Sequence, residues 1–263
     1  MNKTWVTRVM VGIALAQCLA ANLCSAATSD DNLSADQIIQ KSQSAYNALS
    51  SYRDEGTNVT TWANGRIETK HYRVKFARPD LYRIEWMPLP SETMVYWSDG
   101  KGDFTDFGHG VKRVEDPGSF PPGTPAEQME ERDRSINLAN TGKAGEIARI
   151  FFSDSIRENQ PTILSSPWVK TREPDEKAGD VACYVLSWQH YGKWTLWIGK
   201  QDFLIRQVRQ VLISGGEAIL LSSIHDNPAA DAGGKVPNSG FTRIDVHTNI
   251  VINQKLTPSD FAH

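Results

Sequence analysis

From Tyr52 onward the sequence alternates with a period of two residues, and this pattern limits the chain to a fold dominated by β-strands. Segments 53–62 and 66–77 flank Asn64-Gly65, a dipeptide typical of tight β-hairpins. We expect strands that follow one another in the sequence to pair antiparallel. The further predicted strands, which bring the total to about eleven, are 80–87, 92–98, 103–107, 168–173, 180–190, 193–199, 203–213, 217–225 and 241–251.

Helices are predicted only at the start and in the middle of this pattern. Ser34 and Gln37 form a capping-box signal, and the apolar spacing that follows predicts a helix over 34–51. Between Gly108 and Gln160 the sequence becomes rich in proline and charge, with helices predicted at 125–134 and 143–153. Runs of strands with segregated helices indicate an α+β fold, a curved antiparallel sheet whose concave face must be covered.

The first 26 residues have the composition of a secretory signal peptide. They contain Lys3 and Arg8, no acidic residue, an apolar stretch, and small residues before a predicted cleavage after Ala26. A lipid anchor on Cys18 or Cys24 is the alternative that the sequence leaves open. We therefore expect an extracytoplasmic protein, most simply a periplasmic one.

Removal of this segment would leave residues 27–263, which we expect to form a single domain. Two of the 28 basic residues and none of the 31 acidic ones would be lost, which changes the net charge from −3 to −5. That charge makes nucleic acid an improbable partner. Only Cys183 would remain of the three cysteines, so the chain must be stabilised by packing and not by an internal disulfide.

Tryptophan and phenylalanine are concentrated on or beside the predicted strands. Any one of these rings is explained by ordinary core packing, but a wide sheet with two or three helices has more apolar face than those helices can fill. An apolar pocket is the expected consequence. The residues concerned are Trp62, Trp86, Trp97, Phe104, Phe107, Trp168, Trp188, Trp194, Trp197 and Phe203.

Two sequence stretches resemble a known family. VKFARPDLYRIEW at 74–86 and VYWSDGK at 95–101 are similar to the strand pair of the LolA-like periplasmic carriers of outer-membrane lipoproteins, and the segments at 195–211 and 249–261 are similar in kind and order. The resemblance implies a half-open β-barrel closed by a helical lid over a cavity for acyl chains. It also implies that Arg78 bonds lid carbonyls and that Tyr82 lines the cavity. Tyr82 in place of the usual Phe, Asp103, and the long charged segment 108–135 depart from the family pattern.

Arg78 suits the implied role on physical grounds. A guanidinium offers five donors in a fixed fork, keeps its charge, and can lay its stem along an apolar wall. The alternative is an exposed arginine at the start of a strand. The predicted ligand-binding set consists of Arg78, Tyr82, Ile84, Trp86, Val95, Trp97 and Phe104, with the inward-facing half undetermined.

No motif for catalysis is present, so we expect neither an enzyme nor a cofactor. His190, His225 and His247 fall on three predicted strands, but their spacing supports no metal site. We expect a carrier that binds lipid or the acyl chains of lipoproteins and exchanges them with a membrane-bound donor or acceptor. The alternative is a periplasmic lipid-responsive sensor that acts on a protein partner through 108–135.

Overall fold

The computed structural model describes residues 32–89, 92–114, 144–153, 162–212 and 240–262. Its first element is helix α1, Ala35–Ala48, which Ser34 caps. The Ser34 hydroxyl accepts from the Gln37 amide at 3.2 Å, and the Ser34 amide donates to Gln37 Oε1 at 2.8 Å. The predicted capping box is therefore confirmed, and helix α1 ends before Tyr52, where the two-residue period begins.

The described residues form one sheet of eleven strands, and every neighbouring pair is antiparallel. Nine predicted strands are found within two residues of their expected bounds. The strands are β1 Ser51–Trp62, β2 Ile67–Ala77, β3 Leu81–Leu89, β4 Glu92–Ser98, β5 Asp103–Asp106, β6 Lys112–Arg113, β7 Thr171–Ala178, β8 Val181–Gln189, β9 Lys193–Gly199, β10 Ile205–Leu212 and β11 Phe241–Ile252.

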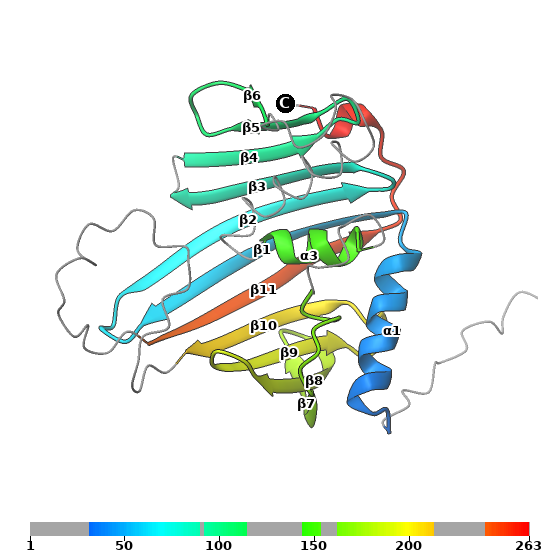
Figure 1. Cartoon of the computed structure of the whole chain (residues 1–263), viewed down its shortest axis with the longest axis vertical. Helices are drawn as coiled ribbons and strands as arrows, with labels where there is room; N and C mark the ends of the chain where they lie inside the picture. Colours follow the sequence, from blue (N-terminus) through cyan, green and yellow to red (C-terminus); the bar gives the residue numbers. More distant parts are fainter. Residues whose placement is uncertain (1–31, 90–91, 115–143, 154–161, 213–239, 263) are drawn as a thin grey trace, which may run out of the picture. The chain divides into compact units, whose positions relative to one another are not determined.

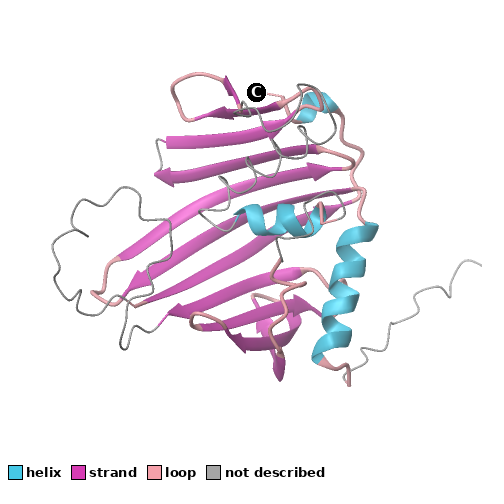
Figure 2. Cartoon of the chain, viewed as in Figure 1, coloured by secondary structure: helices cyan, strands magenta, loops and turns pink. Residues whose placement is uncertain are grey.

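The order of strands across the sheet is β6-β5-β4-β3-β2-β1-β11-β10-β9-β8-β7 (Figure 1). Only β11 departs from simple succession, because it lies between β1 and β10 and joins the two halves of the chain. The sheet curves without closing, and the two α-helices of the described residues, Ala35–Ala48 and Ala144–Phe151, lie on one face of it (Figure 2). The predicted α+β class, a half-open antiparallel barrel with a helical lid, is confirmed.

Strand β7 shows where the sequence pattern misled the prediction. We expected a strand at 168–173 that ended before Pro174, but β7 begins at Thr171 and continues to Ala178. Pro174 lies where the register shifts between Glu173 and Glu176, on an edge strand, so its missing N–H breaks no essential ladder bond. The short strand β6 and a 3₁₀ turn at Pro258–Asp260 were not predicted. The predicted signal peptide, helix 125–134 and strand 217–225 lie outside the described residues.

The register of the sheet assigns each side chain to one of two faces. The inner face, which packs against the helices, carries Tyr52 on β1, Tyr72 and Phe76 on β2, and Ile84 on β3. The outer face carries the residues between them, such as Arg53 and Arg83. Because alternate residues point to opposite faces, this assignment applies along every strand.

Helix α3, Ala144–Phe151, packs against α1, β2 and β3 and lies over the middle of the sheet in Figure 1. Its buried side chains Ile147, Ile150 and Phe151 join the main core, where Phe151 and Phe152 contact Phe76 at ring-centroid distances of 5.7 and 5.8 Å. In the described part of the chain, the helices are too short or too polar to span a bilayer.

Candidate functional site

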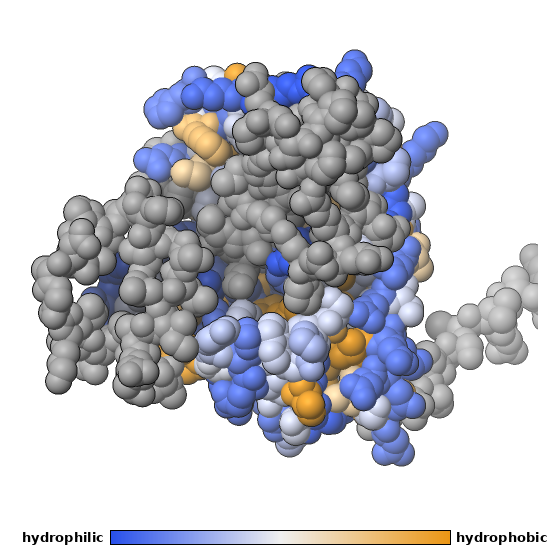
Figure 3. All heavy atoms as spheres, in the orientation of Figure 1, coloured by the Kyte–Doolittle hydropathy of each residue, from blue (hydrophilic) through white to orange (hydrophobic). Residues whose placement is uncertain are grey.

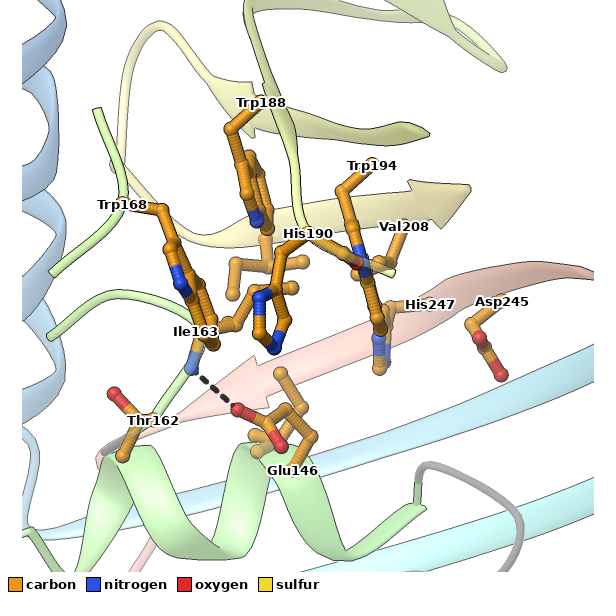
Figure 4. A pocket seen from close by; sticks show the side chains of 12 residues that line it. Glu146, Thr162, Ile163, Trp168, Trp188, His190, Trp194, Val208, Asp245 and His247 are labelled. Carbon is orange, nitrogen blue, oxygen red and sulfur yellow. Dashed lines mark hydrogen bonds between the residues drawn. The ribbon is translucent and has the colours of Figure 1, made fainter. Parts of the chain in front are cut away.

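A cavity of about 230 Å³ lies between α3 and the half of the sheet built from β8 to β11. In the space-filling view of this face, hydrophobic residues show between α1 and the middle of the sheet, with hydrophilic residues around them (Figure 3). Helix α3, the segment 162–168 and the strands all contribute to the walls (Figure 4). The lining residues are Glu146, Ile147, Thr162, Ile163, Trp168, Trp188, His190, Trp194, Ile205, Val208, Asp245 and His247.

Aromatic rings form most of one side of the cavity. Trp188 on β8 and Trp194 on β9 are opposite each other in the register, and their rings stack with centroids 5.8 Å apart and planes 7° apart. Trp168 and His190 stack at 3.5 Å. The Trp194 indole N–H donates to the His190 carbonyl at 2.8 Å, which fixes the turn between the two strands. The rings thus form a rigid apolar wall.

The carboxylate of Glu146 attaches helix α3 to the segment 162–166. Glu146 Oε1 accepts from the Ile163 amide at 2.6 Å, and Arg149 Nη1 lies 3.7 Å from Glu146 Oε2 (Figure 4). Thr162 Oγ1 accepts from the amides of Leu164 and Ser165, which orders the turn that carries Ile163. If α3 moves, the segment 162–166 therefore either moves with it or loses the hydrogen bond between the Ile163 amide and Glu146.

A buried hydrogen-bonded network adjoins the cavity on the inner face of β1, β2 and β11. Asp54 is fully buried, and its Oδ2 accepts from the Tyr52 hydroxyl and lies next to His247 Nδ1, both at 2.7 Å. The Tyr72 hydroxyl lies 3.0 Å from the same His247 nitrogen. Since both contacts use Nδ1, Asp54 favours the tautomer with the proton on Nδ1 and leaves Nε2 as the second polar atom of this ring.

Burial, reinforced by the charge of Asp54, raises the pKa of Tyr52 and of Tyr72 well above the ordinary value for a tyrosine. Both residues therefore stay protonated and serve as hydroxyl groups across the physiological range. Burial also lowers the pKa of His190, so its imidazole is neutral at pH 7. The cavity thus presents neutral aromatic rings together with the carboxylates of Glu146 and Asp245.

A glycine makes the network geometrically possible. Gly56 on β1 lies between Tyr72 of β2 and His247 of β11 in the register. A Cβ at this position would lie 1.9 Å from Tyr72 Cζ, so only glycine allows the Tyr72 ring to cross β1 and reach His247. Asn58, two residues along the strand, donates to Asp245 and so orders a carboxylate of the cavity wall.

Arg78 lies at the turn between β2 and β3 and bridges the C-terminal ends of two helices. Its Nε donates to the carbonyl of Leu49, the C-cap of α1, at 3.0 Å, and its Nη2 donates to the carbonyl of Phe151, the last residue of α3, at 2.6 Å. The guanidinium also lies 4.8 Å from the centroid of the Phe151 ring. A cation is favoured at helix C-termini, where carbonyls lack helical partners.

The other six predicted residues divide between the two faces of the sheet. Tyr82, Ile84 and Trp86 lie on the inner face, buried in the main core. Val95, Trp97 and Phe104 lie on the outer face, because Trp97 pairs with Arg83 and stacks on Phe104 at 5.4 Å. These three cannot line a cavity beneath α3, and none of the six is among the residues lining the cavity.

The cavity residues themselves were not part of the predicted set. Trp168, Trp188 and Trp194 were among the aromatic residues from which an apolar pocket was expected. The predicted ligand-binding residues, however, came from the motif resemblance, which covers β3 and β4. The inward run Asp54, Gly56 and Asn58 was a usable signal, since polar residues at every second position of a central strand indicate a buried network. That signal was obscured because the outward positions of β1 are polar as well.

His190 and His247 both line the cavity, while His225 lies outside the described residues. Among the residues that the structure describes, no group of three His, Cys, Asp or Glu side chains could hold a metal ion. Burial raises the pKa of Cys183, which lies on the outer face of β8. Its thiol is therefore protonated at neutral pH.

No family model and no curated protein matches the chain. Among solved structures, the chain is similar to a LolA superfamily protein from Nitrosomonas europaea, with a TM-score of 0.33, 11% identity and coverage of 88% of this chain and 98% of that one. For lipoprotein LppX from Mycobacterium tuberculosis the TM-score is 0.41, the identity 9%, and the coverage 84% and 96%.

A DUF1329 family protein from Desulfovibrio piger is similar as well, with a TM-score of 0.33, 11% identity and coverage of 86% of this chain and 96% of that one. One of these structures is a LolA superfamily protein, and the strand motifs of this sequence resemble the LolA-like family. At these identities they concern the fold alone.

Proposed function

We propose that this protein is a periplasmic carrier that holds an acyl chain beneath α3 and hands it to an acceptor. The observation that carries the proposal is the aromatic cavity beneath the short helix α3. Arg78 donates a hydrogen bond to the last carbonyl of this helix, that of Phe151. Each buried methylene contributes about 0.8 kcal/mol, so a chain of modest length supplies useful affinity without any reaction.

The size of the cavity implies that α3 moves. At about 230 Å³ it exceeds an engineered cavity of roughly 150 Å³ that binds benzene, but it is smaller than the roughly 300–1,000 Å³ of pockets for drug-sized ligands. A long acyl chain therefore fits only if α3 and the segment 162–166 shift away from β8–β11. Arg78 and Glu146 are the contacts that such a shift would break.

Filling the cavity should weaken binding without unfolding the protein. Val208 on β10 is buried and lines the cavity, so we expect Val208→Phe to weaken binding of a fluorescent acyl lipid at least tenfold. The added ring occupies empty space, so the free energy of unfolding should change by less than about 1 kcal/mol. The measurements are a titration of delipidated protein and a urea denaturation curve. The matched control is Val211→Phe, on the outer face of the same strand; equal weakening in both variants would contradict the assignment of the cavity.

A transfer assay separates a carrier from the alternative, a lipid-responsive sensor. Protein loaded with the fluorescent lipid is mixed with acceptor vesicles, and a carrier should deliver its cargo faster than spontaneous exchange does. A sensor should retain its lipid and capture one protein partner in a lipid-dependent way. Absence of any lipid-mass adduct in native mass spectrometry of the protein from its own compartment would argue against both.

A further inference from the structure

Trp188 presents an unused hydrogen-bond donor to the cavity. Its side chain is 4% exposed and lines the cavity, yet its indole N–H has no acceptor among the described residues. Buried indole N–H groups ordinarily find a partner, and leaving one unsatisfied costs about 1–3 kcal/mol. Trp194, stacked on it, shows the usual situation, with its N–H bonded to the His190 carbonyl. The orphaned donor points to a ligand atom that accepts a hydrogen bond.

The charges around the cavity restrict what that acceptor can be. Two acidic side chains line the wall, Glu146, which lies 3.7 Å from Arg149, and Asp245, which accepts from Asn58. No lysine or arginine is among the lining residues, and burial lowers the pKa of His190, which favours its neutral form. Asp54 lies behind His247, so this pair adds no net positive charge whichever state the imidazole adopts. An ionised carboxylate bound at the Trp188 donor would lie on a wall that carries acidic side chains and no lysine or arginine, which is unfavourable.

Lys170 lies close to Trp188, but it does not add a positive charge to the cavity wall. Its ammonium lies 5.5 Å from the centroid of the Trp188 ring and donates to the carbonyl and hydroxyl oxygens of Ser166, at 3.2 and 3.0 Å. Burial lowers the pKa of Lys170, so its charged form is less favoured there than in water. Lys170 is not among the residues lining the cavity.

A cationic head group fits no better than an anionic one. Recognition of an ammonium needs free aromatic faces, but here Trp188 stacks on Trp194, Trp168 stacks on His190, and Lys170 lies over Trp188. The head group that complements the Trp188 donor is therefore an uncharged hydrogen-bond acceptor. Resting on the proposed acyl-chain function, we propose that the cavity selects acyl chains whose head is an uncharged ester or amide carbonyl, and that the carbonyl oxygen accepts from Trp188 Nε1.

The test compares methyl octanoate with octanoate at pH 7.4 on the delipidated full chain. The ester should bind at least tenfold more tightly than the anion. In ¹H–¹⁵N spectra it should shift the Trp188 indole proton downfield, whereas n-octane supplied as vapour should leave that proton without a downfield shift. Trp188→Phe identifies the resonance by its loss and should weaken ester binding about fivefold, the usual net effect of one hydrogen bond.

Trp194→Phe is the matched control, since it removes an indole N–H that is already bonded within the protein. It should leave the preference for ester over anion unchanged. Equal binding of octanoate and its methyl ester, or an unmoved Trp188 proton in the ester complex, would overturn the carbonyl assignment while leaving acyl-chain binding intact. If neither the ester nor n-octane binds, the proposed carrier function fails and this inference fails with it.

Discussion

Gly56→Ala is expected to lower the free energy of unfolding by about 3 kcal/mol. The new Cβ would lie 1.9 Å from Tyr72 Cζ and 2.1 Å from its hydroxyl oxygen, so the Tyr72 ring or the strand has to move. Overpacking of this kind costs about 1–3 kcal/mol, and displacement of Tyr72 also takes a hydrogen bond from the buried His247. Alanine regains about 0.5–1 kcal/mol through its smaller backbone entropy loss. Urea denaturation measures the difference.

A second variant shows whether the clash is the cause. The atoms in conflict are at the far end of the tyrosine ring, beyond the reach of a leucine side chain. In a Tyr72→Leu background, Gly56→Ala should therefore cost less than about 1 kcal/mol, and the double-mutant cycle should show strong coupling. If alanine costs the same in both backgrounds, Gly56 is required for a reason other than the passage of Tyr72.

Arg78→Leu is expected to release α3 while the sheet stays folded. The change removes two charge-assisted hydrogen bonds to helix-terminal carbonyls, those of Leu49 and Phe151. Helix α3 has only eight residues and is not stable by itself, so its order depends on such contacts. A loss of about 2–3 kcal/mol corresponds to amide hydrogen exchange that is about 30- to 160-fold faster across Ala144–Phe151.

Arg83→Leu provides the matched control for this measurement. Arg83 lies on the outer face of β3 and donates to the carbonyls of Phe261 and Ala262, so it also holds a chain segment but makes no contact with α3. Its replacement should leave exchange in α3 unchanged. Unaltered α3 exchange in Arg78→Leu, or the same acceleration in both variants, would exclude Arg78 as the contact that holds α3.

Much of this fold could be predicted from local signals. The Ser34 capping box, the Asn64-Gly65 turn and the two-residue period each depend on residues close in sequence, and the structure confirms the elements that they predict. The position of β11 between β1 and β10 has no local signal, because its pairing with β1 joins segments nearly 200 residues apart in the sequence.

The site was harder to predict, because it depends on which face of each strand is buried. Strand β4 has apolar residues at both alternations, so sequence alone could not tell that Val95 and Trp97 point outward. Arg78 could be singled out because its motif and its chemistry agree, and the structure places it on the last carbonyl of α3. Its gating role stays a prediction until exchange is measured.

The measurement that tests the central claim most directly is the location of a bound chain. Intermolecular nuclear Overhauser effects should be recorded between a ¹³C-labelled octanoyl ester and the aromatic protons of the delipidated protein. The account predicts contacts to Trp168, Trp188 and Trp194, the rings that line the cavity beneath α3. Contacts confined to Trp97 and Phe104 on the outer face, or no contacts at saturating ester, would contradict it.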